Sequence, residues 1–420
     1  MRWKNLSKWL YPGMKVKRWL LVAAIAALLL GMGLLLVAGK GFVGQLYEVL
    51  AVNQVYYYLL ASVAILTGIL GIVWGLNRAA WSLLSGVTGE ARSSPEIIWQ
   101  KRFLSKGPRV AVIGGGTGLS VLLRGLKRYT SNISAVVTVM DDGGSSGRLR
   151  QEMNMLPPGD IRNCLIALAD NESQMSQLFD HRFGGGGELA GHSLGNLFIA
   201  GMERLTGSFD RGIEETSKLL NVRGEVIPAT LTNTDLVAEL STGEQIRGES
   251  SIADHAGDLV RLKLAEEATP HPKALEALRN AQIIILGPGS LYTSLIPNLL
   301  VNDLAAAIEN AQATKFFIVN LMTEPGETDS FSASDHLRAL EPYLATDCLD
   351  WIVVNTGQIN KDILDQYSQE GADQVEPDLL SDPEWQDRVI SDDLIQVLLM
   401  EGKKTIKHDD ERLTKLILSH

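Results

Sequence analysis

Cysteine is nearly absent from the 420-residue chain, which contains only Cys164 and Cys348. The two thiols lie far apart in the sequence, and no motif surrounds either of them. This scarcity excludes a disulfide framework and is typical of a protein that works in a reducing compartment. No group of histidine and cysteine residues has the spacing of a zinc site either. The sequence therefore does not predict a metal centre built on sulfur and imidazole.

Positive charge is scarce after residue 109. Residues 110–420 contain 25 lysines and arginines against 46 aspartates and glutamates, a balance of −21. Residues 1–109 have the opposite character, with 13 basic and 3 acidic residues. Non-specific binding of nucleic acid requires a basic surface, which the acidic part lacks. We therefore expect no nucleic-acid partner.

Charge is absent altogether from two apolar runs near the N-terminus, Trp19–Gly39 and Val49–Asn77. Each is long enough to span a bilayer, which requires about 20 apolar residues. The alternative for the first run is a signal peptide. Its apolar region, however, exceeds the about 7–15 residues typical of a signal peptide, and a second run follows it. The pattern favours two membrane spans.

Lysine and arginine residues predict how these spans are oriented. Six basic residues precede the first run and six follow the second up to residue 109, whereas the connecting loop contains only Lys40. Because basic residues remain on the cytoplasmic side, both ends should face the cytoplasm. We predict a membrane hairpin over residues 1–78, with spans at about 19–39 and 55–77, a linker over 79–108, and a cytosolic domain over 109–420. This organisation predicts attachment to the inner or cell membrane.

Glycine is plentiful and gathers directly after short apolar runs. Arg109–Ile113 is followed by Gly114–Gly118, and leucines at helical spacing come next. This order predicts a buried strand, a glycine turn and a helix. The same strand-to-glycine order recurs at residues 133–148 and 282–294, and further strands are expected at 315–320 and 351–355. The pattern predicts an α/β fold with a Rossmann-like, mostly parallel sheet and helices on both faces.

The glycine loops and the segments near them supply the candidate ligand-binding residues. Backbone N–H groups of glycines and of helix N-termini favour an anion, and hydroxyl and guanidinium groups add donors. Because the carboxyl ends of parallel strands share one edge of the sheet, the loops should form one site for a phosphorylated, nucleotide-like ligand. The candidates are Gly115, Gly116, Thr117, Gly118, Asp142, Gly143, Gly144, Ser145, Ser146, Arg148, Asn163, His192, Asn196, Gly289, Ser290, Tyr292 and Thr293.

Several candidates also have a structural alternative. A single glycine loop can be a simple turn. Asp160 is either a ligand contact or the N-cap of an apolar helix over residues 161–169. Tyr292 either stacks on a base or belongs to the core. His192 is either a ligand contact or a structural histidine.

Two familiar nucleotide-binding fingerprints are missing. The dinucleotide motif requires glycine at its first, third and sixth positions. Counted from Gly114, the sixth position is Leu119. No Gly-Lys-Ser/Thr sequence completes a P-loop after these glycines. NAD binding and ATP hydrolysis are therefore disfavoured.

Two further patterns suggest chemistry. Gly191–Gly195 matches the G-x-S-x-G of serine hydrolases, but no buried strand precedes it, so a nucleophile is not favoured. Asp141, Asp142 and Asp160 can hold a magnesium ion that bridges phosphates. The alternative is a metal-free site that uses Arg148 and helix N-termini. Magnesium is the one cofactor that the sequence suggests.

Six motifs, in chain order, carry a family resemblance: GGGTGLSVLLRGLK, DDGGSSGRLR, PPGDIRNC, AGHSLGN, LGPGSLYTSLIPNLLV and MTEPGETD. They resemble the YvcK family of gluconeogenesis factors, which is related to the CofD transferases and hence to 2-phospho-L-lactate transferase. The resemblance covers residues 109–356. It implies a Rossmann-like domain that binds a UDP-sugar, with UDP-N-acetylglucosamine as the first candidate. It also implies a role in cell shape, envelope biogenesis and carbon metabolism.

The resemblance leaves a second function open, a CofD-like transfer of a phospholactyl-type group from a nucleotide donor to an acceptor hydroxyl. Asp141 or Asp142 would then position or deprotonate that hydroxyl. The motifs match the YvcK family more closely, which favours a binding and regulatory role. A homo-oligomer and contacts with envelope-biogenesis proteins are also expected. Family members are usually cytoplasmic, so the predicted hairpin departs from the family pattern.

Overall fold

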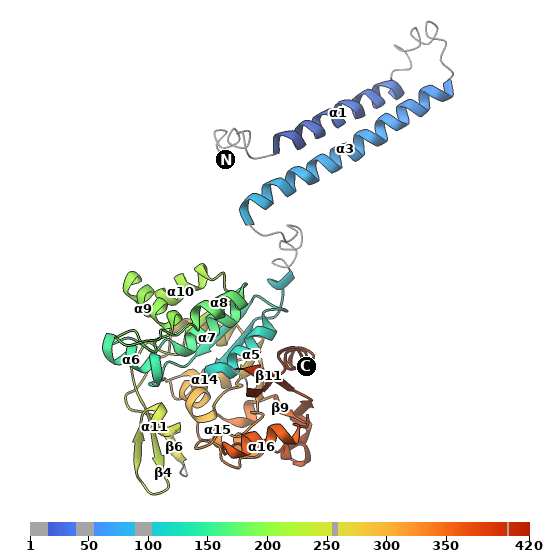
Figure 1. The fold of residues 1–420 in the computed structure, drawn as a ribbon. Helices are drawn as coiled ribbons and strands as arrows, with labels where there is room; N and C mark the ends of the chain where they lie inside the picture. Colours follow the sequence, from blue (N-terminus) through green and yellow to red (C-terminus); the bar gives the residue numbers. More distant parts are fainter. Residues whose placement is uncertain (1–15, 39–53, 89–102, 254–258, 401–402) are drawn as a thin grey trace. The chain divides into compact units, whose positions relative to one another are not determined.

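Figure 1 shows the chain as a computed structural model. The structure describes residues 16–38, 54–88, 103–253, 259–400 and 403–420. The chain divides into two compact units, residues 1–102 and residues 103–420, and each is described by itself. The predicted loop between the two apolar runs and residues 89–102 of the predicted linker lie outside the described residues.

In the described part of the first unit, the helices α1 (Val16–Ala38) and α3 (Gln54–Thr88) pack on each other through small residues. A Cβ atom added to Gly71 would lie 2.7 Å from the Cβ of Ala26. Such close approach is typical of helix pairs with glycine and alanine at their interface. At one end of the pair the rings of Trp19 and Trp74 meet edge to face at 5.0 Å. The Arg78 guanidinium lies over both rings and adds a cation–π contact.

The length of these helices bears on the predicted spans. In the described part of the chain, one helical segment is long and apolar enough to cross a membrane, Tyr58–Arg78 in α3. The apolar segment of α1, Leu21–Val37, is shorter. Both predicted spans are therefore helical, and one of them has the length of a span. α3 continues to Thr88, into the segment predicted as a linker.

The second unit is built on a seven-stranded parallel sheet. In spatial order its strands are β10 (Val389–Asp392), β9 (Trp351–Asn355), β8 (Thr314–Ile318), β7 (Ile283–Leu286), β1 (Val110–Gly114), β2 (Ile133–Val137) and β3 (Glu225–Pro228). The chain runs from β1 to β3 in one direction and then returns to β7 on the other side of β1. This reversal creates a switch point between β1 and β7, the place where open α/β sheets bind their ligands.

Helices cover both faces of the sheet because its central strands alternate between two cores. In β1, Val110 and Val112 belong to one core, whereas Ala111 and Ile113 belong to the other. The first face carries α5 (Gly116–Leu126), α6 (Gly144–Met153), α7 (Gly159–Leu168), α8 (Glu172–Phe179), α9 (Leu194–Thr206), α10 (Phe209–Leu219), α16 (Lys361–Gln369) and α17 (Asp410–Leu418). The second carries the π-helical turn η3 (Leu291–Leu295), α12 (Pro272–Asn280), α13 (Ile296–Leu299), α14 (Leu304–Glu309) and α15 (Ala333–Leu340). The predicted α/β fold class is confirmed.

Two small antiparallel sheets are added to this core. The first, which we call the arm, comprises β4 (Leu236–Leu240), β5 (Gln245–Arg247), α11 (Glu249–Ala253) and β6 (Leu259–Leu264), and it is labelled at the lower left of Figure 1. The second is the hairpin of β11 (Ile395–Met400) and β12 (Lys403–His408). The sequence patterns did not predict β10, β11 or β12, although β10 completes the main sheet.

Candidate functional site

The first and third glycine loops meet at the switch point. A Cβ atom added to Gly118 would lie 2.8 Å from the carbonyl oxygen of Pro288 and 3.0 Å from the Cα of Gly289. Gly116 has a φ of 64°, a conformation that favours glycine. Glycine therefore lets α5 begin directly against the third loop. The first N–H groups of a helix have no partner within it, so they are available to an anion.

A cavity of about 440 Å³ lies above this switch point, and we call it the switch-point cavity. Its volume is within the range of about 300–1,000 Å³ typical of small-molecule sites. Of the candidate residues, Gly115, Gly116, Thr117, Gly118, Gly289 and Ser290 line it. The remaining wall is formed mainly by Asn320–Pro325, which follow β8, by Tyr367 of α16 and its C-cap Glu370, and by Thr405–His408 of β12.

Lys407 of β12 brings a positive charge to this cavity. Its Nζ donates to Oγ1 of Thr117 at 3.1 Å, so the ammonium group lies at the N-terminus of α5. Burial lowers the pKa of Lys407 and Arg124 adds to this effect, whereas Glu324 opposes it. A lysine and a helix N-terminus at one place both favour an anionic ligand. The sequence does not indicate Lys407 as a site residue, because the lysine follows Thr117 by 290 positions and no local pattern marks it.

The second glycine loop begins α6 and joins a network of polar side chains. Ser145 Oγ lies 3.0 Å from Nδ1 of His192 and accepts from Nδ2 of Asn196 at 3.1 Å. Nη2 of Arg148 donates to the carbonyl of Ala190 at 2.7 Å. Burial lowers the pKa of the buried His192, and Arg148 adds to this effect, so its imidazole is neutral. The structure thus brings these predicted residues together, but they bond to one another and do not line the switch-point cavity.

Arg162 connects this network to α7. Its Nη1 donates to Ser193 Oγ at 2.7 Å and to Asn196 Oδ1 at 3.1 Å, and its Nη2 donates to Asn163 Oδ1 at 2.8 Å. Ser193 is fully buried and also accepts from the N–H of Asn196, as the N-cap of α9. The serine of the G-x-S-x-G pattern therefore caps a helix, and it is not an exposed nucleophile.

Carboxylates gather between the second loop and the switch point, and we call Asp141, Asp160, Glu249 and Glu327 the carboxylate cluster. Burial raises the pKa of Asp160 to about 7, and Asp141 adds to this effect. Burial also raises the pKa of Glu327 to about 7, and Glu324 adds to this effect. The pKa of Glu249 is raised by burial and by Asp141 and Asp160. Near neutral pH the cluster therefore retains protons or requires a positive counter-charge.

Three predicted aspartates are held by the backbone. The N-cap of α7 is Pro158, so the prediction that Asp160 can be the cap is wrong. A hydrogen bond from the N–H of Gly116 instead favours the ionised form of Asp160. Asp142 Oδ1 accepts from the N–H of Ser250 in the arm at 2.8 Å, and Asp141 Oδ1 accepts from the N–H of Gly143 at 2.9 Å.

As they are placed, no group of three or more acidic, histidine or cysteine residues in the described ranges can hold a metal ion. The magnesium site stays a prediction.

Tyr292 and Thr293 lie beside the switch-point cavity without lining it. The Tyr292 side chain is 7% exposed and packs in the core, where its ring meets that of Phe331 at 6.4 Å. Burial raises the pKa of Tyr292 to about 12. Oγ1 of Thr293 donates to Oε1 of Glu327 at 2.9 Å. Of the two alternatives for Tyr292, base stacking and a place in the core, this structure has the second.

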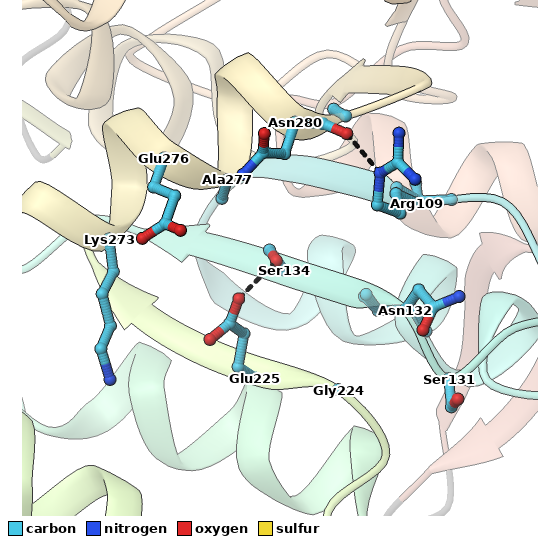
Figure 2. A pocket seen from close by; sticks show the side chains of 13 residues that line it. Arg109, Ser131, Asn132, Ser134, Gly224, Glu225, Lys273, Glu276, Ala277 and Asn280 are labelled. Carbon is cyan, nitrogen blue, oxygen red and sulfur yellow. Dashed lines mark hydrogen bonds between the residues drawn. The ribbon is translucent and has the colours of Figure 1, made fainter. Parts of the chain in front are cut away.

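A second cavity, of about 460 Å³, lies at the opposite edge of the sheet. Figure 2 shows its lining, with Ser134 donating to Glu225 and Arg109 donating to the carbonyl of Asn280. The amino ends of β1, β2 and β3 and one side of α12 form its wall. Two carboxylates and the C-terminus of α12 offset the charges of Arg109 and Lys273, so this cavity offers an anion no net positive charge. The switch-point cavity is therefore the candidate site.

The fold and the site define a class: a doubly wound α/β protein with a glycine-lined cavity at its switch point. Residues 110–395 match the family model of 2-phospho-L-lactate transferase CofD. The gluconeogenesis factor of Bacillus subtilis is 44% identical over 312 residues, which cover 74% of this chain and 97% of that protein. A crystal structure of a Bacillus halodurans protein matches with a TM-score of 0.70 and 45% identity, over 74% of this chain and all of that one. The chain belongs to the CofD family, and its relatives in it are gluconeogenesis factors.

The extent of the alignments differs among these relatives. The match to the Bacillus subtilis protein has about the length of the second unit alone. Relatives from Nostoc sp. and Clostridium acetobutylicum, 42% and 36% identical, align over 98% of this chain and cover 91% and 90% of their own lengths. The N-terminal unit is therefore shared with some relatives and is not peculiar to this chain.

Proposed function

We propose that the chain binds a nucleoside diphosphate sugar in the switch-point cavity and acts as a regulator of cell shape, envelope biogenesis and carbon metabolism. One observation carries the binding proposal: Lys407 contacts Thr117 at the glycine-lined N-terminus of α5, inside a cavity at the switch point. A diphosphate would accept from the N–H groups of Thr117 and Gly118 and from the lysine. The motif resemblance makes UDP-N-acetylglucosamine the first candidate, and the regulatory role rests on the same resemblance.

Calorimetric titration of UDP-N-acetylglucosamine into the full chain in detergent tests the proposal. Lys407→Ala should weaken binding by about 10- to 100-fold, because a charge-assisted hydrogen bond contributes about 1.5–3 kcal/mol. Lys404→Ala is the matched control, since Lys404 lies on the same strand but is exposed and outside the cavity. The control should bind like the wild type. Equal affinity of both variants would remove Lys407 from the site, and a wild-type chain that binds no nucleoside diphosphate sugar contradicts the proposal.

A CofD-like transferase is the second candidate, and the carboxylate cluster favours it. A carboxyl group with a pKa near 7 can take a proton from an acceptor hydroxyl at neutral pH, and Asp160 has such a pKa. Magnesium would supply counter-charge to the cluster and to the phosphates. The test is release of nucleoside monophosphate from a nucleoside diphosphate donor in the presence of an acceptor alcohol, because the acceptor oxygen bonds to the transferred phosphorus as the P–O–P bond breaks. The release is followed by phosphorus NMR with and without magnesium. Stoichiometric binding with no release under either condition rules out transfer from that donor.

We also propose that α1 and α3 form a membrane hairpin that attaches the second unit to the inner or cell membrane on its cytoplasmic side. Large apolar side chains cover the outer faces of the pair, including Leu28, Leu35, Leu60 and Leu66, each more than 60% exposed. Such a surface is unusual in water and is typical of contact with lipid. Homo-oligomerisation and contacts with envelope-biogenesis proteins belong to the same proposal.

A further inference from the structure

The wall of the switch-point cavity contains two carboxylates, Glu324 and Glu370. Glu370 forms an ion pair with Lys403 at 3.0 Å, and more than half of its side chain is exposed. Glu324 is more buried, and burial raises its pKa. Hydrogen bonding from the Ser290 hydroxyl and the positive charge of Lys407 oppose that rise. Glu324 is therefore a carboxylate that Ser290 and Lys407 hold in the wall of the proposed ligand site, where it can accept hydrogen bonds from a ligand.

In related folds a ribose binds to a carboxylate after the second strand, but in this chain the carboxylates at that position already accept hydrogen bonds from the backbone. In dinucleotide-binding folds, an acidic residue at the end of the second strand accepts from the ribose hydroxyls. The corresponding residues here, Asp141 and Asp142, accept from the backbone N–H groups of Gly143 and Ser250. Moreover, no described residue between Val121 and Pro288 lines the switch-point cavity. A nucleoside in this cavity therefore extends over β7 and β8, away from β2.

We propose that Glu324 binds the ribose hydroxyls of the nucleoside diphosphate and so selects ribonucleotides. The inference rests on the proposed function, because it requires the diphosphate to lie at the N-terminus of α5. From there the nucleoside reaches the loop after β8, and Glu324 is the carboxylate of that loop that lines the cavity. Its two oxygens can accept from neighbouring 2′- and 3′-hydroxyls.

Lys407 makes a carboxylate compatible with an anionic ligand in one cavity. The lysine contacts Thr117 at the start of α5, and its charge also acts on Glu324. One cation thus offsets the repulsion between the carboxylate and the diphosphate. Without it, a buried carboxylate beside phosphate would disfavour binding.

Calorimetric titration of UDP and 2′-deoxy-UDP into the full chain tests the inference. The wild type should bind UDP about 10- to 100-fold more tightly than 2′-deoxy-UDP, because the deoxy ligand leaves a charged acceptor without its donor. Glu324→Gln should weaken UDP binding and reduce that ratio to about threefold or less, since a neutral amide accepts more weakly. Glu370→Gln removes a charge from the same cavity wall, so it should change both affinities by the same factor and preserve the ratio.

Four results overturn the inference, and the last of them also defeats the proposed function. A wild-type ratio near one does so whether or not the Gln variant folds. A Glu324→Gln variant that keeps the wild-type ratio does so as well. The third result has two parts: UDP and 2′-deoxy-UDP bind equally, and UDP-N-acetylglucosamine binds more tightly than UDP only when Glu324 is present. This result would show that Glu324 binds the attached sugar instead. A wild type that binds no uridine nucleotide at all defeats the proposed function, and this inference falls with it.

Discussion

Asp160 is a partly buried member of the carboxylate cluster and lies against the first glycine loop, and this position has a thermodynamic consequence. Its pKa rises from an ordinary value of 3.8 to about 7 in the folded chain. Between pH 4 and pH 7 the unfolded chain has lost a proton that the folded chain keeps. The free energy of unfolding therefore falls as the pH rises through this window and levels off above it. The raised pKa of Asp160 therefore lowers the stability of the folded chain near neutral pH.

We predict that Asp160→Asn is more stable than the wild type above pH 7, by on the order of 2–4 kcal/mol, and nearly as stable as the wild type at pH 4. The reason is that asparagine cannot ionise, so the variant lacks this part of the pH dependence. Urea titrations at pH 4.5, 6 and 8 measure the difference. Asp387→Asn is the control, because Asp387 is an exposed carboxylate. A constant difference between Asp160→Asn and the wild type at all three values contradicts the prediction.

At the scale of elements, the loops that follow β1 and β7 act as one unit. Gly118 touches the backbone of Pro288 and Gly289 so closely that any side chain must push the two loops apart. Gly201, in the middle of α9, has open space around it. The two glycines thus form a matched pair in which one substitution disturbs the site and the other does not.

We predict that Gly118→Ala destabilises the chain by about 1–3 kcal/mol, the cost typical of overpacking, and lowers the affinity for a nucleoside diphosphate sugar. Gly201→Ala should leave binding unchanged and raise the free energy of unfolding by up to about 1 kcal/mol, because alanine favours a helix. Thermal unfolding and titration of both variants provide the test. If Gly118→Ala binds and melts like Gly201→Ala, the close contact at the switch point is not required.

Elements with a strong local pattern could be predicted from the sequence. β9 has the predicted bounds, 351–355, because an apolar run is a local signal. β10 has only two apolar residues, and its place at the edge of the sheet follows from pairing with β9. The β11–β12 hairpin adds the lysine of the site by a contact across 290 positions, which local patterns do not encode.

The same distinction applies to the candidate site. The glycine loops at 115–118 and 289–290 line the cavity because backbone freedom is a local property of the sequence. Ser145, His192 and Asn196 are close together as expected, yet their donors and acceptors are used within the network. Whether a side chain faces a ligand or a neighbour depends on tertiary packing. The sequence alone therefore left Tyr292 with two alternatives.

At the scale of the whole molecule, the chain combines units of opposite character. The described helices of the first unit expose large apolar side chains, whereas the second unit is acidic and has its apolar side chains in two cores. Relatives occur with about the length of the second unit alone and with nearly the full length. The switch-point cavity lies wholly in the second unit. We infer that the first unit determines where the protein works.

We predict that the chain crosses the membrane twice, with both ends in the cytoplasm. Basic residues flank the apolar runs on their outer sides, whereas Lys40 is the one basic residue of the loop between them. The loop is therefore the segment that is translocated to the outer side of the membrane. Fusions of green fluorescent protein and alkaline phosphatase at the N-terminus, after Gly44 and at the C-terminus measure the topology. Phosphatase activity is expected only after Gly44, and fluorescence only at the two ends.

The N-terminal fusion decides between two spans and one, because α1 has the shorter apolar segment. If α3 alone crossed the membrane with the C-terminus in the cytoplasm, Gly44 would still be translocated, but the N-terminus would be translocated with it. A signal peptide would give a cleaved chain, which the mass of the mature protein reveals. A cytoplasmic N-terminus, a translocated Gly44 and an uncleaved chain together leave only the hairpin. A translocated C-terminus would contradict the hairpin, because the hairpin places both ends of the chain in the cytoplasm.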